Sequence, residues 1–419
     1  MNDRRRAVIT GLGAITPSGL DVATMWDAVA SGRSAITTLD DPEFTHLAMR
    51  IGGLVRGFEA HTVLDSSLAR RLSPSQHWAV AAGDQAMMQA GWTPGSTDHS
   101  WDPHRFAVIA ATGAGPVDAM QRATRTLDQR GPRAVPLTLA MYGAPDSAAA
   151  VLSQRYQAFG PAQGVSATCA SGAIALGDAM RRIRHGYADA VLVVGVEDCL
   201  NAVNLSSNAN MRALARGYEH DPAAASRPFD QARSGFVMSA GAAAVLLESE
   251  DSVRARGGVA LAELAGFGAA SDAYHPTAPH PQGRGAARAV RDCLADAGFS
   301  ADDVDHINAH GTGTPAGDTA ELNALESALG TRARGIPISS TKSSMGHLLG
   351  ASGVAEAILA VKSLQDGLLP PTINLQNPEF QGWNFVAGQA RRHRISSVLS
   401  NSFGFGGHNG ALLITRRHD

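Results

Sequence analysis

Short apolar runs alternate with longer segments of helical periodicity along nearly the whole sequence. This alternation is typical of α/β proteins, in which helices cover the faces of a largely parallel sheet. The clearest helix is expected over residues 350–366, where Val354, Ile358, Val361 and Leu364 recur on one face at three- and four-residue spacing. The other expected helices are residues 75–90, 145–158, 170–184, 285–297 and 319–329, and the expected strands are residues 7–10, 106–111, 190–195, 243–248, 259–266, 306–309, 396–401 and 410–415.

The order of these elements occurs twice, so we expect two similar halves. The matching segments are the strand ending in "GLG" with residues 264–268, the small-residue helix beginning at Cys169 with the helix after His347, and the strand 190–195 with the strand 396–401. The charged segment 249–258 ends in two glycines and separates the halves, which we place at residues 1–253 and 254–419. A repeat of this length indicates a duplicated domain, since solenoid repeats are much shorter.

Charge and cysteine content exclude several classes of protein. Lys and Arg total 35 against 38 Asp and Glu, a formal net charge of −3, which argues against a dedicated nucleic-acid binder. Three scattered cysteines do not make a disulfide framework, and no CxxC or HExxH pattern indicates a structural zinc. No apolar run approaches the roughly 20 residues of a membrane span. We expect a cytoplasmic enzyme that binds neither nucleic acid nor a membrane.

Cys169 is the first candidate for chemistry. It lies in "VSATCASGA", between a segment of strand character at residues 164–167 and a helix rich in Ala and Gly. At a helix N-terminus, backbone N–H groups and the macrodipole stabilise a thiolate. A buried structural cysteine is the ordinary alternative, and we interpret Cys199 and Cys293 that way. For Cys169 the strand-to-helix turn gives a catalytic role equal weight.

Two histidines lie at the ends of elements in glycine-rich segments. His310 ends a short apolar run in "DHINAHGTGTPAGD", and His347 lies in "TKSSMGHLLGASG", five residues after Lys342. A single histidine is ordinarily a surface or capping residue, and we interpret three others in this way: His275, His280 and His393. Two such histidines in a chain with a poised cysteine form a constellation suited to nucleophilic catalysis.

The segment "SNSFGFGGHNG", residues 400–410, is rich in glycine. Gly404, Gly406 and Gly407 permit positive φ and close backbone approach, as an oxyanion-binding loop requires. A tight turn between two strands accounts for the same residues, and for the segment alone we favour that interpretation. Because the segment is not a GxGxxG motif before a helix, it gives dinucleotide binding little support. The chain also has no GxxxxGK[ST] phosphate loop.

Taken together, these segments resemble the elongating β-ketoacyl-acyl carrier protein synthases of fatty acid synthase II, especially actinobacterial enzymes that extend long acyl chains toward mycolic acids. The resemblance rests on the Cys169 segment, "NAHGTGTPAGD", "STKSSMGHLLGASG" and "NSFGFGG" in that order, and it covers nearly the whole chain. Initiating synthases use a Cys-His-Asn set and fit less well, because both His310 and His347 are present here. The resemblance implies a thiolase fold, an α/β protein of five αβαβα layers with duplicated halves, ordinarily dimeric.

The resemblance also implies a decarboxylative condensation that extends an acyl chain by two carbons. Cys169 would receive the chain from acyl carrier protein, and the backbone N–H groups of Cys169 and Phe403 would hold the oxyanion. The two histidines, neutral at pH 7, would assist loss of carbon dioxide from malonyl-acyl carrier protein. Lys342 would orient the site, paired with Glu356. No metal or organic cofactor would be needed beyond the carrier's phosphopantetheine arm.

Other positions take implied roles as well. Thr312 and Thr314 would hold the phosphopantetheine arm, and Phe403 would gate the acyl pocket. Basic residues near the entrance would dock the acidic carrier protein, and three arginines match such family positions: Arg70, Arg71 and Arg212. A solvated surface arginine is the alternative for each of them.

The chain departs from the family pattern around the expected substrate pocket. After Phe236, which we place at the substrate, residues 239–241 read "SAG" where the family has Gly-Asp-Gly or Gly-Glu, so an acidic side chain is missing. Asn208 replaces an aromatic residue, and Ala114 replaces an isoleucine at the end of the pocket. A smaller and more polar lining would change the length and polarity of the pocket. These changes suggest a specialised synthase, in a secondary-metabolite pathway or tolerant of inhibitors that occupy this pocket.

Two other functions fit parts of this pattern. A non-catalytic partner, like the chain-length factors of type II polyketide synthases, ordinarily lacks the nucleophile, whereas this chain retains Cys169. The chain could also be the catalytic half of such a heterodimer. A thiolase acting on coenzyme A esters needs a second cysteine late in the chain, and the last one here is Cys293. We therefore expect an acyltransferase of fatty acid or type II polyketide biosynthesis, as a homodimer or paired with a chain-length factor.

Overall fold

The computed structural model describes residues 5–94 and 101–417. In this part of the chain, ten strands form one sheet in the order β10-β9-β13-β14-β8-β1-β7-β6-β4-β5. The strands of the first half are β1 (Ala7–Ile15), β4 (Phe106–Ala111), β5 (Ala162–Val165), β6 (Ala190–Glu197) and β7 (Gly241–Ser249). The strands of the second half are β8 (Ala262–Ser271), β9 (His306–Asn308), β10 (Ile338–Ser339), β13 (Ser397–Gly404) and β14 (His408–Thr415).

The two halves of the sheet have the same topology. The order β1-β7-β6-β4-β5 is repeated as β8-β14-β13-β9-β10, with antiparallel and parallel pairs at the same places. Among the described residues, the strands of the two halves are hydrogen-bonded to each other where β1 and β8 pair, at Val8↔Glu263 and Ile9↔Ala262. The expected duplication is therefore confirmed, and the strands matched from the sequence, β1 with β8 and β6 with β13, occupy equivalent positions. The boundary after residue 253 falls within α9 (Glu250–Ala255) and stays a prediction.

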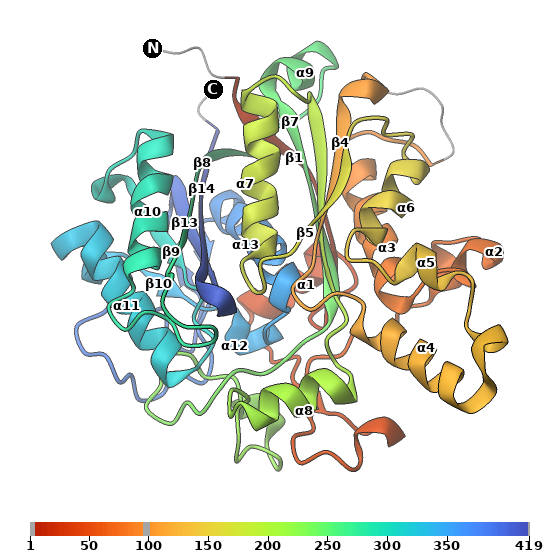
Figure 1. Cartoon of the computed structure of the whole chain (residues 1–419). Helices are drawn as coiled ribbons and strands as arrows, with labels where there is room; N and C mark the ends of the chain where they lie inside the picture. The colour runs from red at the N-terminus through yellow and green to blue at the C-terminus, as the bar shows by residue number, and fades with distance from the viewer. Residues whose placement is uncertain (1–4, 95–100, 418–419) are drawn as a thin grey trace.

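Helices cover and separate the two halves of the sheet, as Figure 1 shows. Two central helices, α7 (Ser171–Arg184) and α13 (Ser352–Asp366), lie between them. The outer helices are α3 (Pro74–Gln89) and α6 (Ser147–Arg155) on one side, and α10 (Arg284–Ala297) and α11 (Pro315–Leu329) on the other. The result is the αβαβα layering of the thiolase fold. Connections carry the remaining helices: α1 (Val22–Ala30), α2 (Ser66–Ala69), α4 (Val117–Arg130), α5 (Leu139–Tyr142), α8 (Ala202–Asn210) and α12 (Lys342–Met345).

Close packing of the two central helices brings the main catalytic candidates together. A Cβ added at Gly172 of α7 would lie 2.9 Å from the backbone nitrogen of Val354, and one at Gly353 of α13 would lie 2.5 Å from that of Ala173. Neither position can accept a side chain, so the two helix starts approach backbone to backbone. Cys169 comes just before α7 and His347 just before α13. The small residues of both helices therefore set the distance between these two segments.

Burial explains which elements could be predicted. Strands β6 and β7 are buried along their whole length, and strands covered on both faces need nearly continuous apolar sequence. Helices α4 and α8 were not expected, because α4 is mostly exposed and α8 has few apolar residues.

None of the helices in the described ranges is long and apolar enough to cross a membrane.

Candidate active site

Cys169 lies in a sharp turn between β5 and α7. The preceding residue, Thr168, has φ +51°, a left-handed conformation that is rare for a β-branched residue. Its hydroxyl donates to the carbonyl oxygen of Phe405 at 2.8 Å. Behind the turn, the hydroxyl of Ser171 accepts the N–H of Ala167 at 2.8 Å. These contacts hold the Cys169 side chain at the edge of a pocket, with 7% of the residue exposed.

The glycine-rich segment forms the β13–β14 hairpin and also contacts the Cys169 turn. Gly406 and Gly407 have φ values of +79° and +73°, as a tight turn between strands requires. Gly404 has an ordinary φ, but a Cβ there would lie 2.2 Å from Oγ1 of Thr168. Both interpretations of this segment, a turn and a loop that approaches the reacting group, therefore apply.

Two backbone N–H groups lower the pKa of the Cys169 thiol, that of Phe405 and that of Cys169 itself. We expected Phe403, which instead lies within β13 opposite Asn409, although its side chain lines the pocket. The strand ends three residues later than the sequence suggested, at Gly404, so the second phenylalanine of "FGF" is the one near the sulfur. Nothing in the spacing of the two phenylalanines distinguishes them.

The thiol of Cys169 is protonated in this state of the protein. Burial raises its pKa to about 12, although the charge of Lys342 and the N–H of Phe405 act in the opposite direction. We expected the helix terminus to favour the thiolate, and burial outweighs that effect. A reaction at this sulfur must therefore remove its proton.

His310 and His347 face each other across the same pocket. Their ring centroids are 5.4 Å apart and the ring planes meet at 82°. Burial, together with the charge of Lys342, lowers the pKa of both imidazoles well below the ordinary value. Both are therefore neutral at pH 7, as expected for groups that donate an N–H to an enolate oxygen.

Hydrogen bonds from other elements hold each histidine. The carboxylate of Glu321 on α11 accepts the N–H groups of His310 and Gly311, both at 2.8 Å. The His347 ring is held at Nδ1, which lies 2.9 Å from the hydroxyl of Ser352. Glu321 and Ser352 could not be singled out from the sequence, because nothing in their spacing marks them as partners of a histidine.

The turn before His347 is supported by Ser239, one of the residues that departs from the family pattern. The Ser239 side chain is fully buried, and its hydroxyl donates to the carbonyl oxygen of Met345 at 2.7 Å. The next residue, Gly346, has φ +72°, and a Cβ there would lie 2.0 Å from this hydroxyl. Where we noted a missing acidic side chain, a serine hydroxyl supports the segment that carries His347.

Lys342 and Glu356 form the predicted ion pair behind the pocket. The Lys342 ammonium donates to a carboxylate oxygen of Glu356, and each side chain is only 2% exposed. Burial raises the pKa of Glu356 to about 7, and the neighbouring Lys342 opposes that rise. Neither residue lines the pocket, so the pair acts on the site through its charge and its position.

One pocket, with about 650 Å³ of empty space, collects most of the residues predicted for catalysis and substrate binding. They are Cys169, His310, His347, Phe236, Thr312, Thr314 and Phe403, joined by Phe405 and Glu321. Phe236 stacks edge-on against His347, with ring centroids 5.5 Å apart. The hydroxyls of Thr312 and Thr314 lie 3.1 Å from each other.

Two predicted pocket residues do not line this pocket. Ala114 is exposed, in the loop after β4, with its N–H donating to Glu197 at 3.2 Å. Asn208 lies on α8, where its amide donates to the carbonyl oxygen of Asn204 at 2.9 Å. Their place in an acyl pocket stays a prediction.

The three predicted docking arginines are all exposed: Arg70, Arg71 and Arg212.

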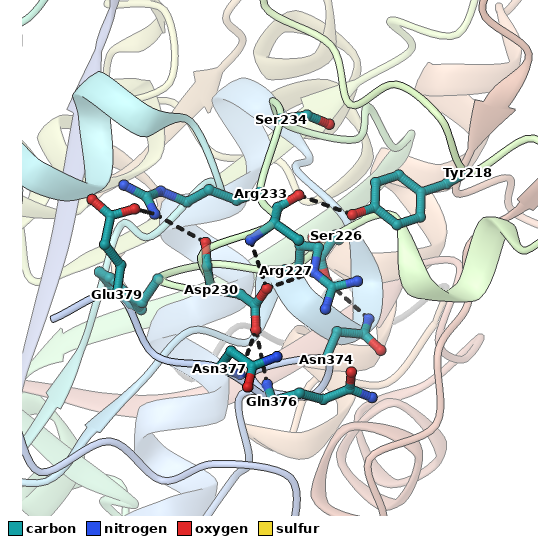
Figure 2. A network of polar contacts seen from close by, with 12 residues as sticks. Tyr218, Ser226, Arg227, Asp230, Arg233, Ser234, Asn374, Gln376, Asn377 and Glu379 are labelled. Carbon is teal, nitrogen blue, oxygen red and sulfur yellow. Dashed lines mark hydrogen bonds and ion pairs between the residues drawn. The ribbon is translucent and has the colours of Figure 1, made fainter. Parts of the chain in front are cut away.

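A buried polar network holds the loop that leads to Phe236 (Figure 2). The Asp230 carboxylate accepts the N–H groups of Gln376 and Asn377, at 2.9 and 2.8 Å, and Nε of Arg227 at 3.1 Å. Burial raises the pKa of Asp230, but these hydrogen bonds bring it below its ordinary value. The carboxylate is therefore ionised and fixes the loop to the 374–379 segment.

The same network reaches the threonine turn. Arg233 donates to Glu379 at 2.5 Å and lies 3.4 Å from a carboxylate oxygen of Asp318 (Figure 2 shows the Arg233–Glu379 contact). The Asp318 carboxylate in turn accepts the N–H of Gly313, between Thr312 and Thr314, at 3.1 Å. The backbone of the turn between the two threonines is thus held from behind by the buried Asp318 and Arg233 side chains.

Comparisons with known proteins agree with this geometry. Residues 4–253 match the sequence model described as "Beta-ketoacyl synthase, N-terminal domain", and residues 261–376 match that of the C-terminal domain. The 3-oxoacyl-[acyl-carrier-protein] synthase 2 of Synechocystis sp. is 39% identical over 416 residues, covering 99% of each chain.

Solved structures give the same result. A ketosynthase in complex with its type II polyketide synthase acyl-carrier protein, bound to the hexaketide, superposes with a TM-score of 0.89 at 29% identity, covering 99% of this chain and 100% of that one. The ishigamide ketosynthase/chain length factor gives 0.90 at 29% identity over the same shares. With both domains matched and full-length relatives above 30% identity, the chain belongs to the β-ketoacyl synthase family.

Proposed function

We propose that this chain is a 3-oxoacyl-acyl carrier protein synthase, an acyltransferase that extends an acyl chain on Cys169 by two carbons with malonyl-acyl carrier protein. The observation that carries the proposal is the single pocket in which the Cys169 thiol and two neutral imidazoles meet. The name of the Synechocystis relative supports the same reaction.

In the first half of the reaction, the Cys169 sulfur attacks the thioester carbonyl of the acyl carrier protein. The C–S bond to Cys169 forms, the bond to the carrier's sulfur breaks, and the carrier leaves as its thiol. The N–H groups of Cys169 and Phe405 stabilise the oxyanion between these steps. Because the pKa of Cys169 is about 12, its proton leaves as the bond forms, and a neutral imidazole in the pocket is the available acceptor.

In the second half, malonyl-acyl carrier protein occupies the same pocket. Imidazole N–H groups of His310 and His347 bind the thioester oxygen while the malonyl carboxylate leaves as carbon dioxide, so that an enolate forms. The enolate carbon attacks the acyl-Cys169 carbonyl, the C–S bond to Cys169 breaks, and the thiolate that leaves takes up one proton from water to restore the thiol. The product is a 3-oxoacyl thioester on the carrier, two carbons longer than the acyl group that entered.

The carrier protein brings its own phosphopantetheine arm, and we assign no further metal or organic cofactor to the reaction. Thr312 and Thr314 hold the arm, since both residues line the pocket and the network behind them holds the turn between them. The exposed arginines Arg70, Arg71 and Arg212 dock the acidic carrier.

A dimer is the assembly we propose. Strand β5 is the last strand of the sheet and is partly exposed, so it leaves one edge of the sheet open. Exposed apolar side chains on α4, the following loop and α5 belong to the same half of the molecule: Met120, Leu127, Leu137 and Met141. The likeness to a ketosynthase/chain length factor favours a second candidate, the catalytic half of such a heterodimer in a specialised pathway.

Intact-protein mass spectrometry tests the proposal directly. The protein is incubated with acyl-carrier proteins of increasing chain length, with Cys169→Ala as the control. We expect a mass gain of one acyl group that is absent in the variant, followed by a 3-oxoacyl product after malonyl-acyl carrier protein is added. Acylation that survives in Cys169→Ala contradicts the proposed nucleophile. No acylation by the chain alone, with activity restored by a copurifying cysteine-less homologue, favours the heterodimer.

A further inference from the structure

The ring of His347 has one nitrogen with a protein partner and one without. Nδ1 lies 2.9 Å from Oγ of Ser352, the first residue of α13. Nε2 is buried and has no hydrogen-bond partner in the described part of the chain, and the ring lines the pocket that holds Cys169. The free nitrogen is therefore the one available to a substrate.

The direction of the Ser352 hydrogen bond decides which nitrogen carries the proton. In a neutral imidazole, one nitrogen is a donor and the other an acceptor. Ser352 is 2% exposed, and within the described ranges its hydroxyl oxygen has no hydrogen bond other than the one to His347. A buried hydroxyl proton without an acceptor is costly, so the hydroxyl donates to Nδ1, and Nε2 then carries the ring proton.

We infer that Ser352 is a positioning residue that fixes the tautomer and orientation of His347, so that Nε2–H points at the substrate's thioester oxygen. The inference rests on the proposed function for its role in decarboxylation. The backbone of His347 is fixed separately, since its N–H donates to Val237 at 2.7 Å and its carbonyl accepts from Ser239 at 2.9 Å. Ser352 therefore fixes the orientation of the His347 imidazole, while the two backbone hydrogen bonds fix its main chain.

His310 provides a contrast within the same pocket. Its Nδ1 is buried and has no hydrogen-bond partner among the described residues. The two rings therefore differ in what fixes them: His347 is a donor locked by a hydroxyl, whereas no partner at Nδ1 sets the tautomer of His310. Loss of the Ser352 hydroxyl should impair decarboxylation, which needs the fixed N–H donor of His347. It should spare acylation of Cys169, because His310 can accept the thiol proton in that step.

Ser352→Ala tests this inference, with Ser363→Ala as the matched control. Ser363 is another buried serine of α13 and does not line the pocket. We expect Ser352→Ala to slow malonyl decarboxylation roughly tenfold, a part of what a positioned acid–base group contributes, while Cys169 acylation stays within about twofold. Ser352→Thr, which keeps the hydroxyl, should restore the decarboxylation rate. Equal losses in both steps, or no loss in either, overturn the inference.

Two further readouts separate positioning from folding. The hydroxyl donates to unprotonated Nδ1 and so favours the neutral ring; its removal should move the acidic limb of the decarboxylation pH profile upward. Nitrogen NMR of histidine-labelled wild-type protein, assigned with His347→Asn, should show Nδ1 unprotonated and Nε2 protonated. A protonated Nδ1 overturns the inference even if Ser352→Ala fails to fold. If the wild-type protein neither acylates nor decarboxylates, the proposed function fails, and the NMR result still decides the tautomer.

Discussion

The hydroxyl of Thr168 donates to the carbonyl oxygen of Phe405 at 2.8 Å, and this contact joins the turn that carries Cys169 to the hairpin that supplies the second N–H group at its sulfur. Two segments 237 residues apart in sequence thus form one oxyanion site. Because Thr168 is held in a left-handed conformation, the contact also offsets local strain.

Thr168→Val should slow Cys169 acylation about tenfold, less than the 10²–10³-fold lost when an oxyanion donor is removed outright. Valine keeps the shape and branching of threonine and removes only the hydroxyl. Thr319→Val is the matched control, since Thr319 is half-buried on α11, away from the pocket, and its hydroxyl also donates to a backbone carbonyl, that of Pro315 at 2.8 Å. Acylation rates from intact mass measure the effect. Equal rates for Thr168→Val and the wild type would show that the hairpin holds its place without this contact.

The high pKa of Cys169 predicts how the free enzyme reacts with alkylating agents. Since burial raises that pKa to about 12, the rate of alkylation by iodoacetamide should keep rising between pH 6 and pH 10. Cys199 and Cys293 are fully buried with raised pKa values, so the label should appear at Cys169 alone, and Cys169→Ala serves as the blank. An alkylation rate that stops rising near pH 7 would mean that the helix terminus lowers the pKa of Cys169 more than burial raises it.

The sequence could predict the parts of the fold and site that leave a local pattern. Strand β6 was recognisable because burial on both faces imposes a continuous apolar run, and helix α13 because large apolar residues recur in it at three- and four-residue spacing. Cys169, His310 and His347 were recognisable because each stands at the end of an element in a glycine-rich segment. In all these cases the physical constraint acts between neighbours in the chain.

The contacts that complete the site join distant segments and leave no such pattern. Ser239 and Met345 are 106 residues apart, and the choice of Phe405 over Phe403 depends on where β13 ends against β14. Glu321 accepts the backbone N–H of His310 from a helix whose start the sequence placed four residues too late. Tertiary packing decides each of these, so they appear only in three dimensions.

The buried Lys342–Glu356 pair predicts a non-additive stability cycle. Lys342→Met or Glu356→Leu alone should lower the free energy of unfolding by about 3–5 kcal/mol, because each leaves one buried group without its partner. The double variant Lys342→Met/Glu356→Leu should recover much of that loss, since no unpaired charge remains. Urea unfolding at pH 7 measures all four proteins. Losses that simply add would mean that the two side chains do not interact.

His306 predicts a loss of stability in acid. Its side chain is 1% exposed, Nε2 lies 3.1 Å from the Ser339 hydroxyl, and burial lowers its pKa to about 3. Below pH 6.5 the unfolded chain therefore binds a proton that the folded chain does not bind until about pH 3, so stability falls through this range by about 1.4 kcal/mol per pH unit. Above pH 6.5 both states are neutral and the contribution is constant.

His306→Leu removes this titration, and the stability difference between wild type and variant should shrink by about 2 kcal/mol from pH 7 to pH 5. Urea unfolding at the two pH values gives the difference. The Ser339 hydroxyl keeps its hydrogen bond to the carbonyl oxygen of Pro370, at 2.6 Å, so the variant leaves no unsatisfied donor there. A difference that is the same at both pH values would place the acid sensitivity elsewhere, with His310 and His347 as the next groups to test.

Arg212 should act on the carrier protein rather than on the chemistry. It is exposed and does not line the pocket, so Arg212→Glu should raise KM for acyl carrier protein about tenfold and leave kcat at saturation unchanged, since a rim charge steers the encounter. An acyl thioester of free pantetheine, which lacks the acidic protein, should be used equally well by the variant and the wild type. The control is Arg392→Glu, an exposed arginine on the separate sheet of β11 (Leu368–Leu369) and β12 (Arg391–Arg392). A change in KM for both substrates would assign Arg212 to the pocket, and no change for either would make it an ordinary surface residue.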